Sequence, residues 1–516
     1  MQYDSIFGGH WTLPAGWLWG GILLYVLLML LIGGYASRKV RSMTDFIVAG
    51  RRLTLFPAVG TLLATWFGAG TCIGISAAVY KGGIHSVIAD PFAVTVCLLL
   101  AGFFLAGVLR RMNYMTVTDI IHDHYGRGAG IYASLWMIPA YIGLLSAQIL
   151  GIGTVLHLFA GWDLICAQLV AALVILLYTA IGGMWAVTLT DQVQMVLILV
   201  GLFLILPGAV REAGGWQSIV SSLNGSDSIL PTASERASFS GMINYGGNWM
   251  IMGLGCIVGQ DLLQRSLACK DERTARNSTL ITAALYFFIA LIPLAIGLAA
   301  RIILPKWGVT PEMMGNDLEN QVMPRIAAGI LTPVSPVLLI LFLGALISAI
   351  MSTADSSLLA ASSLLIRNVI QPLFPSVPDK SLLLYTRIAT VLLIVLSTVL
   401  SMMAESVYAL MISASASQLV IVLLPVFAAI YLPSASRSAV WTGMLAGTVS
   451  WLGYLLYKGC VLEGALFAFF RSDMFQYELT NGAVYGFFAA LVGFFFVFCK
   501  QKLTSIKKWP LRRFVP

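Results

Sequence analysis

Long runs of apolar residues, each about as long as a helix, are separated by shorter polar stretches along this chain. Runs of about 20 mostly apolar residues, the length that crosses a bilayer as a helix, recur throughout. Thirteen such runs begin near positions 17, 54, 87, 131, 163, 188, 243, 278, 333, 382, 408, 437 and 483. The longest polar stretches between them, about 209–242, 303–332 and 458–482, are predicted as loops. The pattern predicts an all-α polytopic membrane protein with no separate soluble domain.

The composition agrees with this pattern and excludes several classes of protein. Hydrophobic residues make up 59% of the 516 positions and charged residues 10%, against about 25% charged residues in soluble domains. The formal net charge of +8 comes from short basic clusters between apolar runs, so no nucleic-acid partner is indicated. The seven cysteines show no paired spacing, which indicates neither a disulfide framework nor a zinc site. We expect a multi-pass protein of the plasma (inner) membrane, with no obligatory protein partner.

The distribution of lysine and arginine predicts the orientation. If the N-terminus lies outside, all but eight of the 30 basic residues fall on the cytoplasmic side. The eight on the outer side are Lys81, Arg211, Arg236, Arg301, Lys306, Arg325, Lys458 and Arg471. Because basic loops stay on the cytoplasmic side, we expect a retained first helix, an outer N-terminus and an inner C-terminus.

Two of the predicted helices contain glycines in mid-span. The second reads LATWFGAGTCIGISAAVY, and the seventh reads YGGNWMIMGLGCIVGQ. These helices lie five apart along the chain, so they cross in opposite directions. Paired interruptions in two inverted halves are typical of the binding site of a secondary transporter. Close packing through glycine is the alternative for either helix alone, and the matched pair favours two broken helices.

The ninth helix carries hydroxyl groups and a carboxylate in SAIMSTADSSLLAASS, residues 348–363. Ser348, Ser352 and Ser356 share one face because they lie four residues apart, and Thr353 and Asp355 flank that face. A charge at mid-bilayer costs at least about 2.5 kcal/mol, so Asp355 should face protein, water or an ion. Hydroxyl oxygens and the carbonyls of a broken helix suit Na⁺. Helix packing through small serines is the alternative, and Asp355 favours the ion site.

Further polar residues lie in or beside apolar runs. Asp191, near the start of the sixth helix, belongs either to an ion site or to an interfacial helix cap. Asp90, just before Pro91, either faces an outer vestibule or caps a helix, and we assign it no role. The segment HDHYGRG, residues 122–128, is predicted as a solvated loop, because His-X-His without further ligands is a weak metal motif.

Five segments resemble motifs of the sodium:solute symporter family, which includes transporters of proline, sugars, sialic acid and choline. They are FIVAGRRL (46–53), LATWFGAGTCIG (63–74), GGMWAVTLTDQVQ (182–194), GQDLLQR (259–265) and SAIMSTADSS (348–357). They occur in family order, and the resemblance covers nearly the whole chain. It implies one transporter domain over 1–516 with a LeuT-type core. Two inverted five-helix repeats would occupy 54–208 and 243–431, with an extra helix at 17–36 and two more helices at 437–500.

Carried over by position, the resemblance also implies sodium ligands. The principal site would use the backbone carbonyls of Ala64, Phe67 and Ala349 and the hydroxyls of Ser352 and Thr353. A candidate second sodium site would use Asp191, Ser352, Asp355 and Ser356. Asp355 stands where some two-sodium members have a serine, so its charge either strengthens the second ion or replaces it.

The same resemblance leaves the solute open. The solute site would be lined by Trp66, Gly70, Gln148, Asn248, Gln260, Tyr408 and Met411. The motifs look most like the choline branch, yet the aromatic cage that cation–π recognition of choline requires is mostly absent. Trp66 matches that cage, whereas Val94, Gly259 and Met411 stand at its other positions. Trp66 also replaces the aspartate of the proline branch, so neither choline nor proline is supported.

Together these observations predict a symporter that imports a small polar organic solute by alternating access, with Na⁺ as its coupling ion. One alternative is a proton-coupled symporter of the same fold that uses Asp355 or Asp191. Another is a membrane sensor built on this fold, but the short tail after Cys499 carries no signalling domain. An enzyme is not expected, because no Ser, Cys or metal partner accompanies His122 or His124 at the same depth.

Overall fold

The computed structural model describes residues 15–38, 40, 42–225, 227–309, 318–404, 407–462 and 474–507. Within these ranges the chain is almost entirely helical, and its extended pairing is an isolated bridge between Leu53 and Cys269. Nine helices of the described part are long and apolar enough to cross a membrane, and one bent pair makes a tenth. The predicted all-α membrane fold is confirmed. The count of thirteen crossings and the orientation stay predictions.

The first half of the chain consists mainly of helices, several of which carry predicted site residues. They are α2 (Ala15–Ser37), α4 (Leu55–Trp66), α5 (Ile75–Gly82), α6 (Val94–Leu100), α7 (Gly107–Met112), α8 (Val117–Tyr125), α9 (Arg127–Ala160) and α10 (Leu164–Glu212). Short 3-10 or π-helical turns join some of them, namely η2 (Gly70–Gly74), η3 (Ile84–Val87) and η4 (Ile88–Ala93).

The second half of the chain is also largely helical. Its helices are α12 (Ala233–Arg236), α13 (Phe239–Gly253), α14 (Gln260–Ala268), α15 (Glu272–Lys306), α17 (Leu318–Leu331), α18 (Pro336–Ser363), α20 (Asp379–Met403), α21 (Val407–Ser417), α22 (Leu423–Tyr431), α23 (Arg437–Leu462) and α25 (Met474–Lys507). The turn η6 (Gly255–Val258) precedes α14, and η8 (Leu364–Ile370) and α19 (Gln371–Leu373) prolong α18.

Both glycine-rich helices are interrupted in mid-span. α4 ends at Trp66, and Phe67 leaves the helical path with φ −91° and ψ 64°. The chain then continues through η2 and α5 at 55° to α4. In the second case α13 ends at Gly253, and Gly259, with ψ 131°, turns the chain into α14. Helix ends leave backbone groups without intrahelical partners, so each break offers polar backbone groups inside the bundle.

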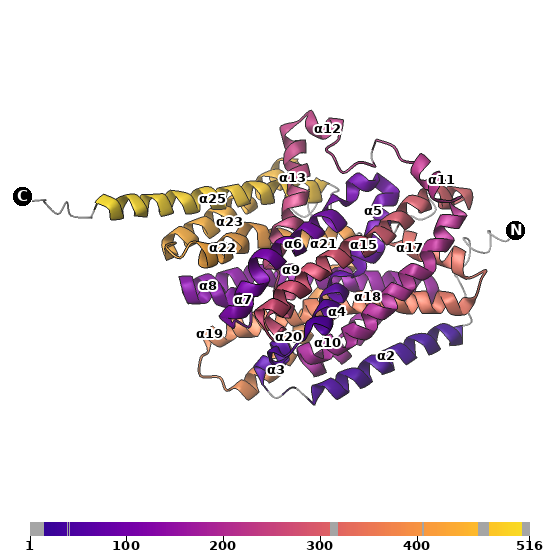
Figure 1. The fold of residues 1–516 in the computed structure, drawn as a ribbon, viewed down its shortest axis with the longest axis horizontal. Helices are drawn as coiled ribbons and strands as arrows, with labels where there is room; N and C mark the ends of the chain where they lie inside the picture. The colour runs from indigo at the N-terminus through magenta and orange to yellow at the C-terminus, as the bar shows by residue number, and fades with distance from the viewer. Residues whose placement is uncertain are drawn as a thin grey trace, which may run out of the picture.

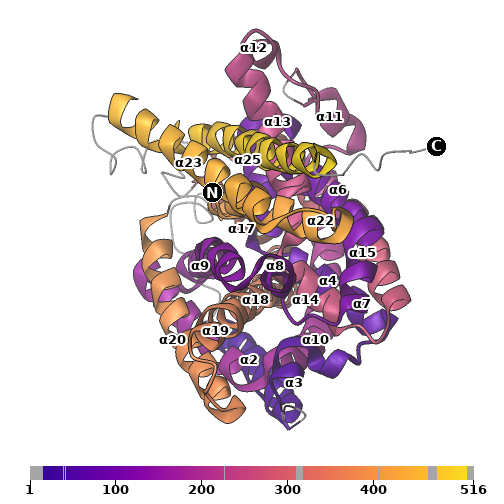
Figure 2. The same ribbon diagram turned by 90° about the vertical axis from the view of Figure 1, so that its left-hand side faces the viewer.

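The helices that carry the predicted ion ligands lie at the centre of the molecule. Figure 2 shows α4, α14 and α18 in the middle of the bundle, between α15 on one side and α20 on the other. α18 contacts α4, α9, α10 and α14. Ser348, Ser352 and Ser356 are fully buried, so the hydroxyl face of α18 points into protein and not toward lipid.

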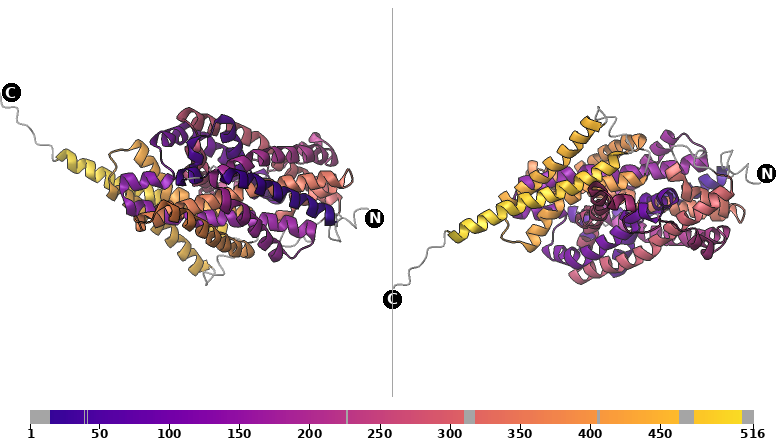
Figure 3. Two further views of the ribbon diagram at one scale, coloured as in Figure 1. Left: turned by 90° about the horizontal axis from the view of Figure 1, so that it is seen from below. Right: turned by 90° about the horizontal axis from the view of Figure 1, so that it is seen from above.

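Helices outside the central group flank it on two sides. α2 packs along α10 and also contacts α18, while α23 and α25 pack against each other. α25 extends beyond the rest of the bundle (Figures 1 and 3). α2 and α25 both run from right to left in Figure 1, so they cross the molecule in the same direction. Two membrane-spanning helices run in the same direction when the number of crossings from the first to the second, counting both, is odd.

Two segments predicted as loops are helical, and those predictions are wrong. Residues 122–125 belong to α8, at whose start Asp119 accepts hydrogen bonds from the Met115 and Thr116 N–H groups. The missed signal is the spacing TVTD, residues 116–119, a capping box with Asp in place of Glu or Gln. α17 fills much of the expected loop 303–332, because its apolar residues Val322, Met323 and Ile326 are buried against the bundle.

Candidate functional site

A central cavity of about 50 Å³ lies beside the break in α4. Four of the predicted solute ligands line it: Trp66, Gly70, Gln148 and Met411. Gln148 Oε1 accepts a hydrogen bond from the Ala69 N–H at 2.8 Å, so this side chain from α9 satisfies a backbone group of the break. A Cβ atom at Gly70 would lie 2.3 Å from the Met411 sulfur. The absence of a Cβ at Gly70 therefore lets the Met411 side chain of α21 pack directly against η2.

Two other predicted solute ligands are not among the residues that line this cavity. Asn248 on α13 donates to Asn244 at 3.3 Å. Gln260 accepts from the Val117 N–H at 2.8 Å, at the start of α8. The break before α14 directs Gln260 toward that helix end, and Asp261 takes a place in the cavity wall instead. The side chain of Tyr408 lies outside the described residues.

The cavity is also lined by polar groups for which no role was predicted from the sequence. Asp90, 1% exposed, accepts from the Tyr286 hydroxyl at 2.5 Å and from the Thr71 hydroxyl at 2.8 Å. The ring of Tyr286, on α15, stands edge-on to that of Trp66 with centroids 6.4 Å apart. Asp90 had a sequence signal, a carboxylate in an apolar run. Tyr286 had none, because an aromatic residue in a membrane helix is ordinary.

The hydroxyls of α18 reach the broken end of α4. Thr353 Oγ1 donates to the Thr65 carbonyl at 2.8 Å. A Cβ atom at Gly68 would lie 2.4 Å from Thr353 Oγ1, so α18 and the break in α4 are in direct contact. Ser352 donates to Asp191 Oδ1 at 2.6 Å. Each hydroxyl uses its proton in these bonds and keeps lone pairs that a cation can accept.

The residues whose backbone carbonyls are predicted to bind Na⁺ are all buried. Ala64 and Phe67 are 0% exposed and Ala349 is 1% exposed. Phe67 lies just past the end of α4, where helical hydrogen bonding stops. Backbone carbonyls and neutral hydroxyls in a dry setting form the kind of oxygen shell that transporters of broken-helix type present to Na⁺. These residue types fit the ion chemically.

Two of the residues predicted for a second Na⁺, Asp191 and Ser356, lie beside the guanidinium group of Arg265. Asp191 is fully buried and lies about two turns beyond the break of α10 at Gly183, so it does not cap a helix end at the interface and that alternative is wrong. It accepts from Thr61 and Ser352, and Arg265 Nη2 lies 3.8 Å from its Oδ2. Arg265, also fully buried, donates to Ser356 as well. A fixed cation from α14 therefore stands beside the carboxylate of the candidate second site. Asp355 is buried one residue from Ser356, and Ser356 Oγ lies 3.2 Å from its Oδ1.

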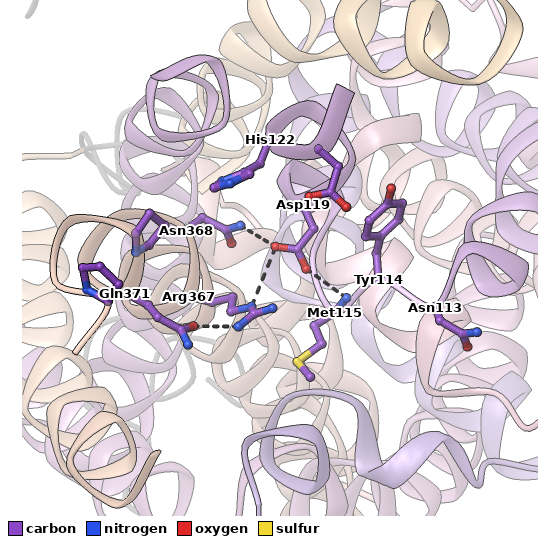
Figure 4. A pocket seen from close by; sticks show the side chains of 11 residues that line it. Asn113, Tyr114, Met115, Asp119, His122, Arg367, Asn368 and Gln371 are labelled. Carbon is purple, nitrogen blue, oxygen red and sulfur yellow. Dashed lines mark hydrogen bonds and ion pairs between the residues drawn. The ribbon is translucent and has the colours of Figure 1, made fainter. Parts of the chain in front are cut away.

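A larger cavity of about 310 Å³ opens where α8 meets η8 and α19 (Figure 4). Asp119 accepts from Asn368 at 2.8 Å and lies 3.8 Å from Arg367 Nε. Its other oxygen accepts from the Met115 N–H at 3.1 Å. His122 lines this cavity, and no group of three or more potential metal-ligating side chains occurs in the described part of the chain. Because η8 continues α18, Asp119 ties α8 to the helix of Ser352 and Thr353.

Comparison with known proteins agrees with this geometry. The chain is 30% identical over 403 residues to a high-affinity choline transporter of Drosophila melanogaster, covering 75% of this chain and 62% of that protein. It is 28% identical over 363 residues to a sodium/pantothenate symporter of Haemophilus influenzae, covering 68% of this chain and 72% of that protein. This chain thus matches less than two thirds of the length of the Drosophila transporter.

Solved structures share the fold. A Na⁺-coupled sialic acid symporter in a substrate-bound, outward-open state matches with a TM-score of 0.74 at 19% identity, over 93% of this chain and 97% of that one. A nucleobase-cation-symport-1 family transporter matches with a TM-score of 0.51 at 14% identity, over 88% and 95% of the two chains. Residues 46–447, which include both broken helices and the oxygen-rich part of α18, match the model of the sodium:solute symporter family. The chain belongs to the sodium:solute symporter family.

Proposed function

We propose that this protein imports a small organic solute together with Na⁺ by alternating access. The solute occupies the central cavity, and Na⁺ binds where α18 meets the break in α4. One observation carries the proposal: Thr353 of α18 donates to the Thr65 carbonyl at the end of α4. Family membership supports a membrane transporter rather than an enzyme, with sodium as the coupling ion.

The sodium site that we propose consists of the carbonyls of Ala64, Phe67 and Ala349 and the hydroxyls of Ser352 and Thr353. Ala64 and Phe67 lie in α4 and at its end, whereas Ala349, Ser352 and Thr353 lie in α18, which belongs to the other half of the chain. An ion that binds both helices stabilises the conformation in which they meet. Na⁺ can shift the transporter between conformations only if it binds one of them more tightly than the other. A site formed by two helices meets this condition, because it is complete only when the helices are in contact.

Asp191 pairs with Arg265 in this proposal, and no second Na⁺ binds beside it. The guanidinium is fully buried and lies between Asp191 and Ser356. A buried carboxylate needs a compensating charge, and the arginine supplies one that never leaves. The stoichiometry expected at these two sites is one sodium ion for each solute.

The cavity's charge narrows the choice of solute. Choline and pantothenate, named for two relatives, are a cation and a carboxylic acid. Two carboxylates, Asp90 and Asp261, line the cavity, and its described lining contains no Lys, Arg or His. An anionic solute would meet only like charge there. We therefore infer that a solute carrying a net negative charge is not accepted.

Uptake by the purified protein in liposomes tests this function. Labelled cationic, zwitterionic, neutral and anionic metabolites are offered with an inward Na⁺ gradient, or with K⁺ at equal ionic strength, while the pH gradient is collapsed. We expect uptake of at least one solute to require Na⁺ and to saturate with a Hill coefficient near one. Full uptake in sodium-free medium, driven by a pH gradient alone, would support the proton-coupled alternative and refute the proposal.

A further inference from the structure

Asp90 stands at the centre of a hydrogen-bond network that faces the central cavity. Its two oxygens accept from Tyr286 and Thr71, which come from α15 and η2. The Thr71 hydroxyl also lies 3.0 Å from the Trp66 carbonyl and 3.0 Å from the Tyr286 hydroxyl. Asp90 itself sits on η4, so three separate segments of the chain bring these groups together.

This network has too few protons for its acceptors. Each hydroxyl carries one proton, whereas an ionised carboxylate offers about four lone-pair positions. Two hydroxyl protons therefore serve three acceptor atoms, the two oxygens of Asp90 and the carbonyl of Trp66. A ligand that brings N–H donors would complete the bonding. A ligand without donors would leave the buried carboxylate under-satisfied, which is costly.

Two further groups in the cavity wall have no partner among the described residues. The indole Nε1 of Trp66 is a buried donor without an acceptor, and Oε1 of Gln418 is a buried acceptor without a donor. Buried polar groups are normally hydrogen-bonded. A ligand that brings an oxygen acceptor would satisfy the Trp66 indole N–H. A further N–H or O–H donor on the ligand would satisfy Gln418 Oε1.

Charge and shape favour an amine over a quaternary ammonium ion. A quaternary ammonium has no N–H to donate and depends on several aromatic faces for binding. The aromatic residues in the described lining are Trp66 and Tyr286, and the ring of Tyr286 already packs edge-to-face with Trp66 and Phe67. A protonated amine brings positive charge and up to three donors, and bonds between charged groups are the stronger ones.

We propose that the solute is a small protonated primary or secondary amine that also carries a hydroxyl or carbonyl oxygen. Its ammonium group donates to Asp90, and its oxygen accepts from Trp66 Nε1. This inference rests on the proposed function and names the class of substrate that the central cavity takes.

Ethanolamine and choline form the matched pair that tests it. Both carry a positive charge and the same hydroxyl, and they differ in whether the nitrogen bears hydrogen atoms. Uptake of each labelled compound is measured in liposomes with an inward Na⁺ gradient, beside glycerol and pantothenate as neutral and acidic controls. We expect amines to be transported at least tenfold more efficiently than choline. Preference for choline, glycerol or pantothenate would overturn the inference while leaving sodium-coupled transport intact.

Asp90→Asn supplies the second test. Loss of one charged hydrogen bond should raise the KM for the amine by roughly ten- to hundredfold. Stabilisation of the purified variant by Na⁺ should be unchanged, since the ion is bound elsewhere. Equal transport of the amine by variant and wild type would overturn the inference. If no solute of any class shows sodium-dependent uptake, the proposed function fails and this inference fails with it.

Discussion

Replacing Arg265 with glutamine should expose how the buried charge of Asp191 is balanced. Arg265 Nη2 lies 3.8 Å from Asp191 Oδ2, and both side chains are 0% exposed. Removing one partner of a buried ion pair typically costs about 3–5 kcal/mol, because the other charge remains buried and uncompensated. Glutamine also loses the bonds to Ser356 and to the Asp261 carbonyl, each worth about 1.5–3 kcal/mol because the donor is charged.

The paired variant Asp191→Asn/Arg265→Gln separates these contributions. It removes both charges, so only ordinary hydrogen bonds are lost, and we expect it to be more stable than Arg265→Gln alone by at least about 2 kcal/mol. Na⁺ should rescue the single variant, because a vacated cation position beside Asp191 can accept it. Saturation at a hundred times the dissociation constant would restore about 2.7 kcal/mol.

Thermal unfolding of the purified proteins in NaCl or KCl of equal ionic strength measures these effects. Arg111→Gln serves as the control, since Arg111 and Glu272 form an exposed pair, and such pairs contribute at most about 1 kcal/mol. The reasoning is refuted if the single and double variants unfold at the same temperature. It is also refuted if Na⁺ stabilises wild type with a Hill coefficient near two.

Three more predictions test other parts of the molecule. Thr353→Val and Ser352→Ala should weaken sodium activation of uptake far more than expression, because each removes an oxygen ligand in a dry site; unchanged sodium dependence in both would contradict the assignment. Asp355→Asn should shift the sodium response without creating or removing proton dependence, measured as uptake with and without a pH gradient. The pKa of Glu235 lies below its ordinary value, since partial burial raises it but hydrogen bonds from His85 and Thr232 lower it more. Its stabilising contribution is therefore present above the unfolded pKa and is lost as pH falls through the native one. Amide exchange in α12 should quicken there, and Glu235→Gln should remove that pH dependence.

The features of the site that were predictable from the sequence are those that are unexpected in an apolar membrane-spanning segment. The matched glycine clusters in two helices, and the carboxylate beside the hydroxyls of α18, indicated a function without knowledge of the fold. Asn248 and Gln260 show where this reasoning ends. The path of the chain between Gly253 and Gly259 decides which side chains face the cavity, and that path depends on neighbouring helices. Tyr286 reached the site only through the packing of α15 against α4, which no local pattern records.

The tertiary partners of side chains that had been identified in the sequence could not be predicted either. Asp191 was identifiable as an intramembrane carboxylate, but its distance to Arg265 is a tertiary fact, because 74 positions separate the two along the chain. In contrast, the capping box of α8 was readable from TVTD. Local hydrogen bonding leaves a fixed spacing in sequence, whereas long-range charge pairing does not.

Because η8 and α19 continue α18 without a break, a small tilt of this helix near Thr353 produces a larger displacement at its far end. Thr353 and Arg367 are fourteen positions apart, which corresponds to about 21 Å at helical rise. A tilt of about 10° with its pivot at Thr353 would move Arg367 by about 4 Å. That displacement exceeds the reach of the Asn368–Asp119 bond, which is 2.8 Å long. A movement of this size at the far end would thus release α8, so the strength of the Asp119 contacts would set how readily that end of the molecule opens.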